Sequence, residues 1–211
     1  MNSEELSATD VVKLVESLIG RVAQIDGERE TGEFGHYLHQ LPISQRALDP
    51  LIAGLSHESR TVRHFCARAL GRLADPFETP TLGRAAVAPA VPALMDRLRR
   101  EAPPVESKFV YLTALATLGS YAREAMPLLR ELMTWWPRPE RLLIAVAMAE
   151  IADKSDPQAL DSIVGVAVSE TSSHNQARLI EALYRLRFGR WPKEMEREME
   201  SGEAAEAQAG S

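Results

Sequence analysis

Apolar residues recur with a helical period along most of the chain. In the stretch RTVRHFCARALGRLAD, residues 60–75, they are spaced three and four apart, which places them along one face of an α-helix. This face consists of Val62, Phe65, Cys66, Ala69, Leu70 and Leu73. No segment shows the sustained two-residue alternation that is typical of a strand. The pattern therefore predicts an all-α protein.

The same periodicity predicts a series of helices joined by mostly short connections. Short connections make consecutive helices antiparallel neighbours. The longest connection between them, residues 75–89, is either a functional loop or an insertion without a role of its own. The expected helices are residues 8–26, 34–40 (short), 44–56, 60–74, 87–101, 106–121, 123–136, 140–152, 156–170 and 174–188.

A helical hairpin repeats four times within these segments. Each hairpin opens with a proline in the first turn of a helix, where the missing N–H costs no hydrogen bond. The second helices also align, since Leu70-Gly71 corresponds to Leu118-Gly119. One hairpin cannot bury its own apolar face, so the four are expected to stack on one another. The prolines are Pro50, Pro92, Pro127 and Pro157, separated by 42, 35 and 30 residues.

One hairpin resembles a known repeat. Residues 48–75 look like a HEAT repeat of the short bacterial type that is also found in phycobilin lyase subunits, although Ser56-His57-Glu58 stands where HEAT repeats carry an aspartate. The other hairpins keep the proline and the apolar spacing but lose the Val-Arg pair. Over residues 44–188 the resemblance implies an armadillo-like, right-handed α-α superhelix, a solenoid of about four hairpins. The matching features are Pro50, Leu55, Val62-Arg63, Ala69, Leu70-Gly71 and Leu73.

This architecture divides the chain into three expected parts. Residues 1–43 would supply N-terminal capping helices, and residues 44–188 would form the repeat array. Residues 189–211 would form a C-terminal cap followed by a disordered acidic tail. Caps are expected because the open end of a solenoid exposes an apolar face to water.

Charge and composition limit the kinds of partner and the cellular compartment that we expect for this protein. The net charge is −6, which makes nucleic acid an unlikely partner because neutralising its phosphates takes a surplus of Lys and Arg. No apolar run approaches the roughly 18 residues that a membrane span needs. The polar, acidic start MNSEELSATD and the single cysteine favour the cytoplasm, a reducing compartment.

A basic ridge is the first candidate binding surface. Arg60, His64, Arg68 and Arg72 recur every four residues, on a side of the helix away from the apolar face. The second helix of a HEAT hairpin usually lines the concave surface, where such a ridge would suit an acidic peptide or a phosphate. The alternative is a solvated face with salt bridges to neighbouring acids. Cys66 is expected to be a buried structural thiol, since His64 two residues earlier points about 200° away.

Two further features could contact a partner. The stretches FVYLTALATLG (109–119) and LLIAVAMAEIA (142–152) are apolar nearly all round, so they are either buried between neighbours or border a groove for an amphipathic helix. Such a groove would be lined by Leu112, Ala116 and Val146. Adjacent tryptophans point to different faces, so one of Trp135 and Trp136 is expected in the core and the other at a contact surface.

The chain carries no recognisable catalytic motif. It has no phosphate-binding GxxxxGK and no GxSxG, and no nearby pair of carboxylates completes a metal site with His36 and His39. We therefore expect no catalytic residue, cofactor or metal, and a scaffold that binds another protein. The alternatives are a HEAT-like enzyme of the chromophore lyase or DNA alkyl-base glycosylase type, or a homo-oligomeric structural protein.

Overall fold

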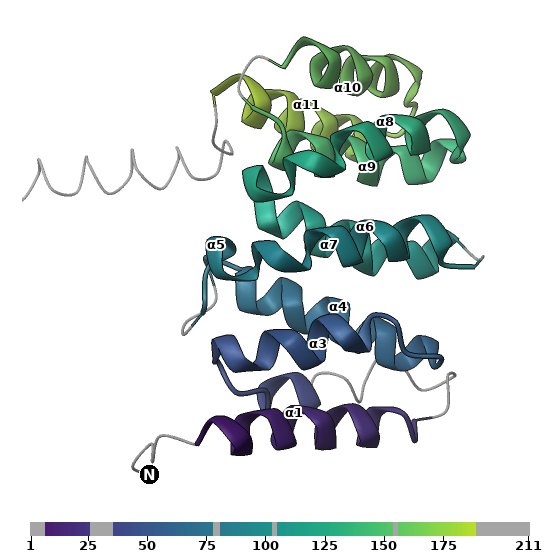
Figure 1. The fold of residues 1–211 in the computed structure, drawn as a ribbon. Coiled ribbons are helices and arrows are strands. Elements are labelled where there is room, and N and C mark those ends of the chain that lie inside the picture. Colours follow the sequence, from purple (N-terminus) through teal and green to yellow (C-terminus); the bar gives the residue numbers. More distant parts are fainter. Residues whose placement is uncertain (1–6, 26–35, 78–80, 103–104, 154–155, 189–211) are drawn as a thin grey trace, which may run out of the picture. The chain divides into compact units, whose positions relative to one another are not determined.

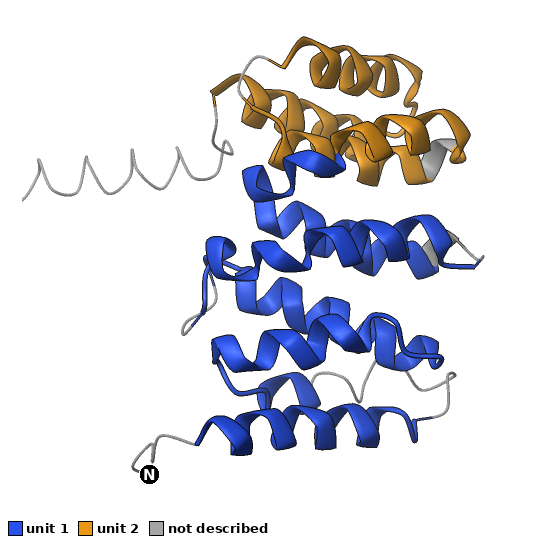
Figure 2. Cartoon of the chain, viewed as in Figure 1, with its two compact units in different colours: residues 1–125 blue, residues 126–211 orange. Residues whose placement is uncertain are grey.

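The structure is a computed structural model that describes residues 7–25, 36–77, 81–102, 105–153 and 156–188 (Figure 1). Every regular element in these ranges is helical, which confirms the all-α class. The chain divides into two compact units, residues 1–125 and residues 126–211 (Figure 2).

The first unit contains a leading helix and two hairpins. The leading helix is capped by Ser7, whose hydroxyl accepts a hydrogen bond from the backbone N–H of Asp10 at 3.2 Å. A short helical turn at residues 36–39 follows it. The elements are α1 (Ala8–Val22), the 3₁₀ helix η2 (Gln45–Ala47), α3 (Leu48–Gly54), α4 (Arg60–Ala74), α5 (Arg84–Val87), η3 (Ala88–Ala90), α6 (Val91–Arg100), η4 (Val105–Lys108), α7 (Phe109–Leu118) and η5 (Gly119–Ala125).

The second unit consists of two further hairpins. Its third helix starts with Pro157 and is capped by Asp156, whose carboxylate accepts hydrogen bonds from the backbone N–H groups of Gln158 and Ala159 at 3.0 Å. The same carboxylate pairs with Arg130 at 3.2 Å, which ties one hairpin to the next. The helices are α8 (Met126–Trp135), α9 (Arg138–Ile151), α10 (Pro157–Ser169) and α11 (Ser173–Phe188).

Several expected helices are interrupted. The segments expected at 106–121 and 123–136 are broken by η5, because Gly119 adopts a positive φ of 58° and ends α7. The segments expected at 44–56 and 87–101 each begin with a 3₁₀ turn before the α-helix. The connection at 75–89 carries α5, so part of it is regular structure, and its role stays a prediction.

The hairpins stack within each unit as the repeat predicts. In the first unit α3 packs on α4, α6 packs on α7, and α4 also packs on α7; in the second, α9 packs on α8, α10 and α11. The boundary between the units falls inside the predicted array, 44–188. The divisions after residues 43 and 188 and the right-handed sense of the superhelix stay predictions, and the predicted C-terminal cap and tail lie outside the described residues.

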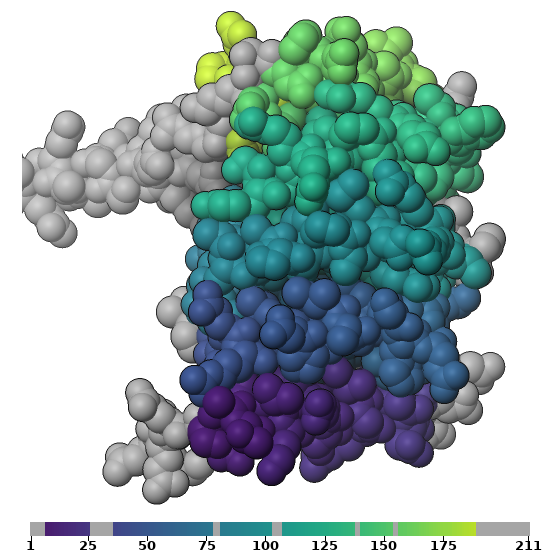
Figure 3. Space-filling model, in the orientation of Figure 1, coloured from purple at the N-terminus to yellow at the C-terminus, as the bar shows by residue number. Residues whose placement is uncertain are grey.

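The predicted apolar faces form the core. On α4 the stripe is 0–2% exposed throughout, so the interpretation of Cys66 as a buried thiol is confirmed. The nearly all-apolar helices α7 and α9 each contact several neighbouring helices in their own unit, which buries most of α9 and one side of α7, while Thr113 on α7 is exposed. Within the first unit, side chains close the spaces that a ribbon leaves between stacked helices (Figure 3).

Close packing of α3 on α4 explains a buried glycine. A Cβ added at Gly54 would lie 2.4 Å from the Sγ of Cys66, so alanine cannot fit without a shift. We expect Gly54→Ala to lower the free energy of unfolding by about 1–2 kcal/mol, even though alanine favours helix. Chemical denaturation of both proteins measures the change.

A second substitution checks the cause of that loss. With Cys66→Ala in the background, the nearest remaining atom of residue 66 is the Cβ at 3.6 Å, an ordinary contact. The double variant should therefore be more stable than the sum of the single changes by about 1 kcal/mol. Strict additivity of the two changes would contradict the steric account.

Candidate binding groove between α4 and α7

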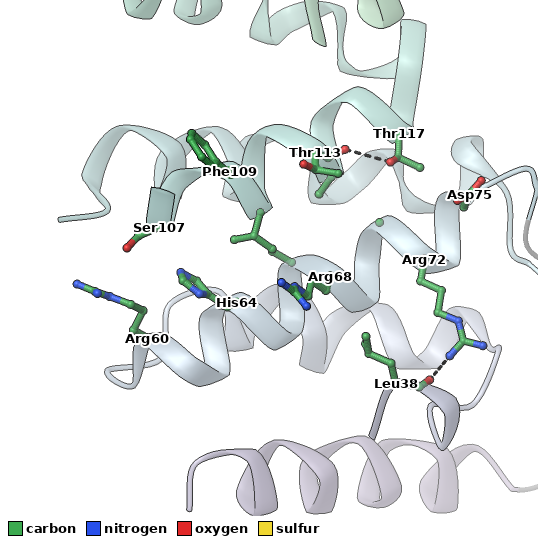
Figure 4. A pocket seen from close by; sticks show the side chains of 14 residues that line it. Leu38, Arg60, His64, Arg68, Arg72, Asp75, Ser107, Phe109, Thr113 and Thr117 are labelled. Carbon is green, nitrogen blue, oxygen red and sulfur yellow. Dashed lines mark hydrogen bonds between the residues drawn. The ribbon is translucent and has the colours of Figure 1, made fainter. Parts of the chain in front are cut away.

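A groove of about 800 Å³ lies between the second helices of the two hairpins in the first unit (Figure 4). Such a volume is in the range of sites that bury small ligands or the side chains of a docked segment. It is lined by Leu38, Arg60, His64, Ala67, Arg68, Gly71, Arg72, Asp75, Ser107, Phe109, Val110, Thr113, Ala114 and Thr117.

The α4 side of the groove is the basic ridge that the sequence predicts. Arg60, His64, Arg68 and Arg72 all line it, because a four-residue spacing keeps them on one side of the helix (Figure 4). Arg68 is exposed and the other three are half-buried. The Arg72 guanidinium donates a hydrogen bond to the backbone carbonyl of Leu38, another residue that lines the groove. The ridge therefore borders a hollow, and its part in binding stays a prediction.

The α7 side is apolar with two hydroxyls. Phe109, Val110 and Ala114 line it together with Thr113 and Thr117, and the Thr117 hydroxyl donates to the Thr113 carbonyl at 3.0 Å. The small residues Ala67, Gly71 and Ala114 form the floor of the groove, where the two helices approach closely: a Cβ added at Gly71 would lie 3.6 Å from the Cα of Ala114.

A buried glutamate at the end of α6 supports one end of the groove. Glu101 is 2% exposed, and its carboxylate accepts hydrogen bonds from Arg63 Nε at 2.9 Å and Arg63 Nη2 at 2.5 Å. The Tyr111 hydroxyl donates to the same carboxylate at 2.8 Å, and the guanidinium groups of Arg60 and Arg97 each lie 3.6 Å from it. This cluster joins the Val62-Arg63 pair of one hairpin to both helices of the next.

The electrostatics of the cluster favour the ionised carboxylate. Burial alone would raise the pKa of Glu101, but the hydrogen bonds from Arg63 and Tyr111 and the charges of Arg63 and Arg97 outweigh it and lower the pKa to about 2. Burial, together with the hydrogen bond to Glu101, raises the pKa of Tyr111. The glutamate is thus a fixed anion at neutral pH.

Two groove residues rest directly on this cluster. Arg60 pairs with Glu101, and the His64 ring packs edge-on against the Tyr111 ring with 5.8 Å between centroids. The buried hydroxyl-bearing residue Ser107 lines the groove at the same end, from the 3₁₀ helix η4 that precedes α7 (Figure 4). The polar end of the groove is therefore held in place from behind by buried ion pairs.

The prediction of an apolar groove lined by Leu112, Ala116 and Val146 is wrong for Leu112, and for Ala116 and Val146 it stays a prediction. Leu112 is 2% exposed and lies in the core, because it is two residues and about 200° around the helix from the groove residue Val110. Ala116 is half-buried but does not line the groove, and Val146 is half-buried on α9 in the second unit.

The two tryptophans divide as predicted. Trp136 is 5% exposed and belongs to the core, so its candidacy as a contact residue is wrong, while Trp135 is 79% exposed at the end of α8. Trp135 belongs to the second unit and is not among the groove residues. Its role at a contact surface stays a prediction.

The single cysteine is a protonated thiol in the core. Burial raises the pKa of the Cys66 thiol to about 12, so the thiolate nucleophile does not form at neutral pH. In the described part of the chain, no three His, Cys, Asp or Glu side chains are grouped so as to hold a metal ion. Of the helices in those ranges, none combines the length and the apolar character that crossing a bilayer requires.

Sequence reasoning missed Glu101, the α7 wall and one apolar stripe. HEAT repeats carry an aspartate in the turn where this chain has Ser56-His57-Glu58. Glu101 could have been considered as the acid that takes its place, because it ends the stretch DRLRRE at the end of the first helix of the following hairpin. On α10, Leu160, Val164 and Val168 recur every four residues and are 40–82% exposed, which leaves an apolar stripe on the second unit.

Stacked helical hairpins with a groove between their second helices define an α-helical repeat protein. Residues 62–100, from α4 to the end of α6, match the family model described as PBS lyase HEAT-like repeat, which confirms the HEAT-like resemblance in this part of the chain. No curated protein and no solved structure matches the chain.

Proposed function

We propose that the chain is a non-catalytic interaction module that holds a segment of another protein in the α4–α7 groove. The observation that carries this proposal is the groove itself, which has an arginine-bearing wall, an apolar wall and a floor of small residues. Interfaces that bind protein segments combine such apolar surface with a few fixed polar groups. The rigid backing by Glu101 supports it, because a preformed site loses less entropy on binding.

Site-specific photo-crosslinking in the native host tests this role. A photoreactive residue at Thr113, an exposed position in the groove, should crosslink one identified protein, and the adduct should be lost when the groove is altered by Arg68→Glu. The matched control places the same group at Lys13, an exposed position on α1. Crosslinking that is equal at both positions, or none at Thr113, would overturn the proposal.

A further inference from the structure

We propose that the segment held in the groove is an acidic amphipathic helix, with carboxylates every fourth residue facing α4 and an adjacent apolar stripe facing α7. This inference rests on the proposed function and adds the chemistry of the partner. It starts from the unequal walls of the groove, one basic and one apolar.

The charges of the groove select an acidic ligand. Three arginines and one aspartate line it, although the chain as a whole has a net charge of −6. The Glu101 carboxylate is 1% exposed, so an approaching ligand meets the arginine side chains and not this acid. Arginine also offers a planar fork of N–H donors that fits a carboxylate. The groove is thus a local positive site on an acidic protein.

The spacing of the charges matches that of a helix. Residues four apart on α4 are about 6 Å apart along the axis, so the ridge from Arg60 to Arg72 extends about 18 Å. A helix lying along α4 with an acid at every fourth residue repeats at the same interval over three turns. An extended segment places every second side chain about 6.8 Å apart, so its acids would drift out of register along the ridge.

The backbone of the groove also favours a helix. The N–H and C=O groups of α4 and α7 are used within these helices, so the walls offer no ladder to an extended chain. A helix satisfies its own backbone and can lay an apolar stripe against Phe109, Val110 and Ala114 at no such cost. The small residues Ala67 and Gly71 form the floor on which its side chains would lie.

Titration of the full chain with synthetic peptides tests this inference. The probe is a fluorescein-labelled peptide of about 14 residues, roughly four helical turns, with Glu at every fourth position and Leu on the neighbouring stripe. We expect it to bind at least tenfold more tightly than the same peptide with Gln for each Glu. Arg68→Glu should remove that preference, whereas Arg21→Glu, an exposed reversal on α1, should leave it unchanged.

The outcomes separate the inference from the function on which it rests. Equal binding of the Glu and Gln peptides, or full binding to the Arg68→Glu protein, overturns the acidic helix. A single-stranded oligonucleotide also overturns it, in favour of nucleic acid, if it displaces the labelled Glu peptide at a lower concentration than the unlabelled Glu peptide does. A basic or neutral segment crosslinked at Thr113 overturns the acidic helix while the interaction role stands.

Discussion

Replacing Glu101 with glutamine should lower the free energy of unfolding by about 3–5 kcal/mol, because it leaves the buried guanidinium of Arg63 without its counter-charge. That is a large share of the roughly 5–15 kcal/mol by which a domain is stable. Tyr111→Phe removes one hydrogen bond to the same carboxylate and should cost about 2 kcal/mol. Urea or thermal unfolding of the full chain measures both.

A second ion pair on the same helix provides the control. Arg100 and Asp96 pair at 2.8 Å with side chains that are 72% and 41% exposed. Asp96→Asn should change stability by less than about 1 kcal/mol, since water screens an exposed pair. Equal effects of Glu101→Gln and Asp96→Asn would contradict the structural role of the buried cluster.

The same carboxylate makes stability depend on pH in acid. The pKa of Glu101 is lowered on folding from 4.5 to about 2, so its contribution is fully present above about pH 4.5 and is lost as the pH falls toward 2. This lowering of the pKa corresponds to about 3 kcal/mol in the free energy of unfolding. The difference in stability between wild type and Glu101→Gln should therefore shrink over this window. A difference that stays constant from pH 6 to pH 2 would show that Glu101 is not ionised in the folded protein.

Filling the groove should weaken binding at least tenfold without unfolding the protein. Thr113 is an exposed residue of the groove, so Thr113→Trp places a large side chain where the partner segment would lie. We expect at least a tenfold loss in affinity for the acidic probe peptide and loss of the partner in a pull-down with the full chain. The free energy of unfolding should change by less than about 0.5 kcal/mol, as for most surface substitutions.

Ser120→Trp is the matched control for this block. Ser120 is exposed, two residues after α7 ends, and does not line the groove. Its replacement should leave binding unchanged. A loss of affinity in both variants, or in neither, would show that the partner does not occupy the groove.

The helices and their apolar faces follow from local periodicity. A stripe such as Val62, Phe65 and Leu70 is encoded within a few turns, and the structure buries it as predicted. The helix breaks near Gly119 were harder to place, because a glycine inside an apolar pattern can either continue the helix or end it with a positive φ.

The groove depends on two helices at once. The sequence shows the ridge on α4 because its members are four residues apart, but the opposite wall comes from residues on α7. Alignment of the repeats pairs His64 with Leu112. Equivalent positions of two stacked repeats do not face each other, because the groove is bordered by the side of α4 that faces α7 and by the side of α7 that faces α4. His64 therefore lines the groove, whereas the equivalent Leu112 is buried in the core.

The buried cluster shows the same limit. Arg63 and Glu101 are 38 residues apart in sequence, and only the stacking of one hairpin on the next brings them to 2.5 Å. The charge pattern around Glu101, with Arg97 four residues before it, looks from the sequence like an ordinary solvated helix end.

Methyl NMR of the full chain with and without the acidic probe peptide tests the central claim most directly. The methyl groups of Ala67, Thr113, Ala114 and Thr117 line the groove, whereas Val164 and Val168 are exposed on α10 in the other unit. We predict that saturating peptide shifts the four groove methyl signals and leaves the two valines in place. Unshifted groove signals, or shifts confined to α10, would contradict binding in the α4–α7 groove.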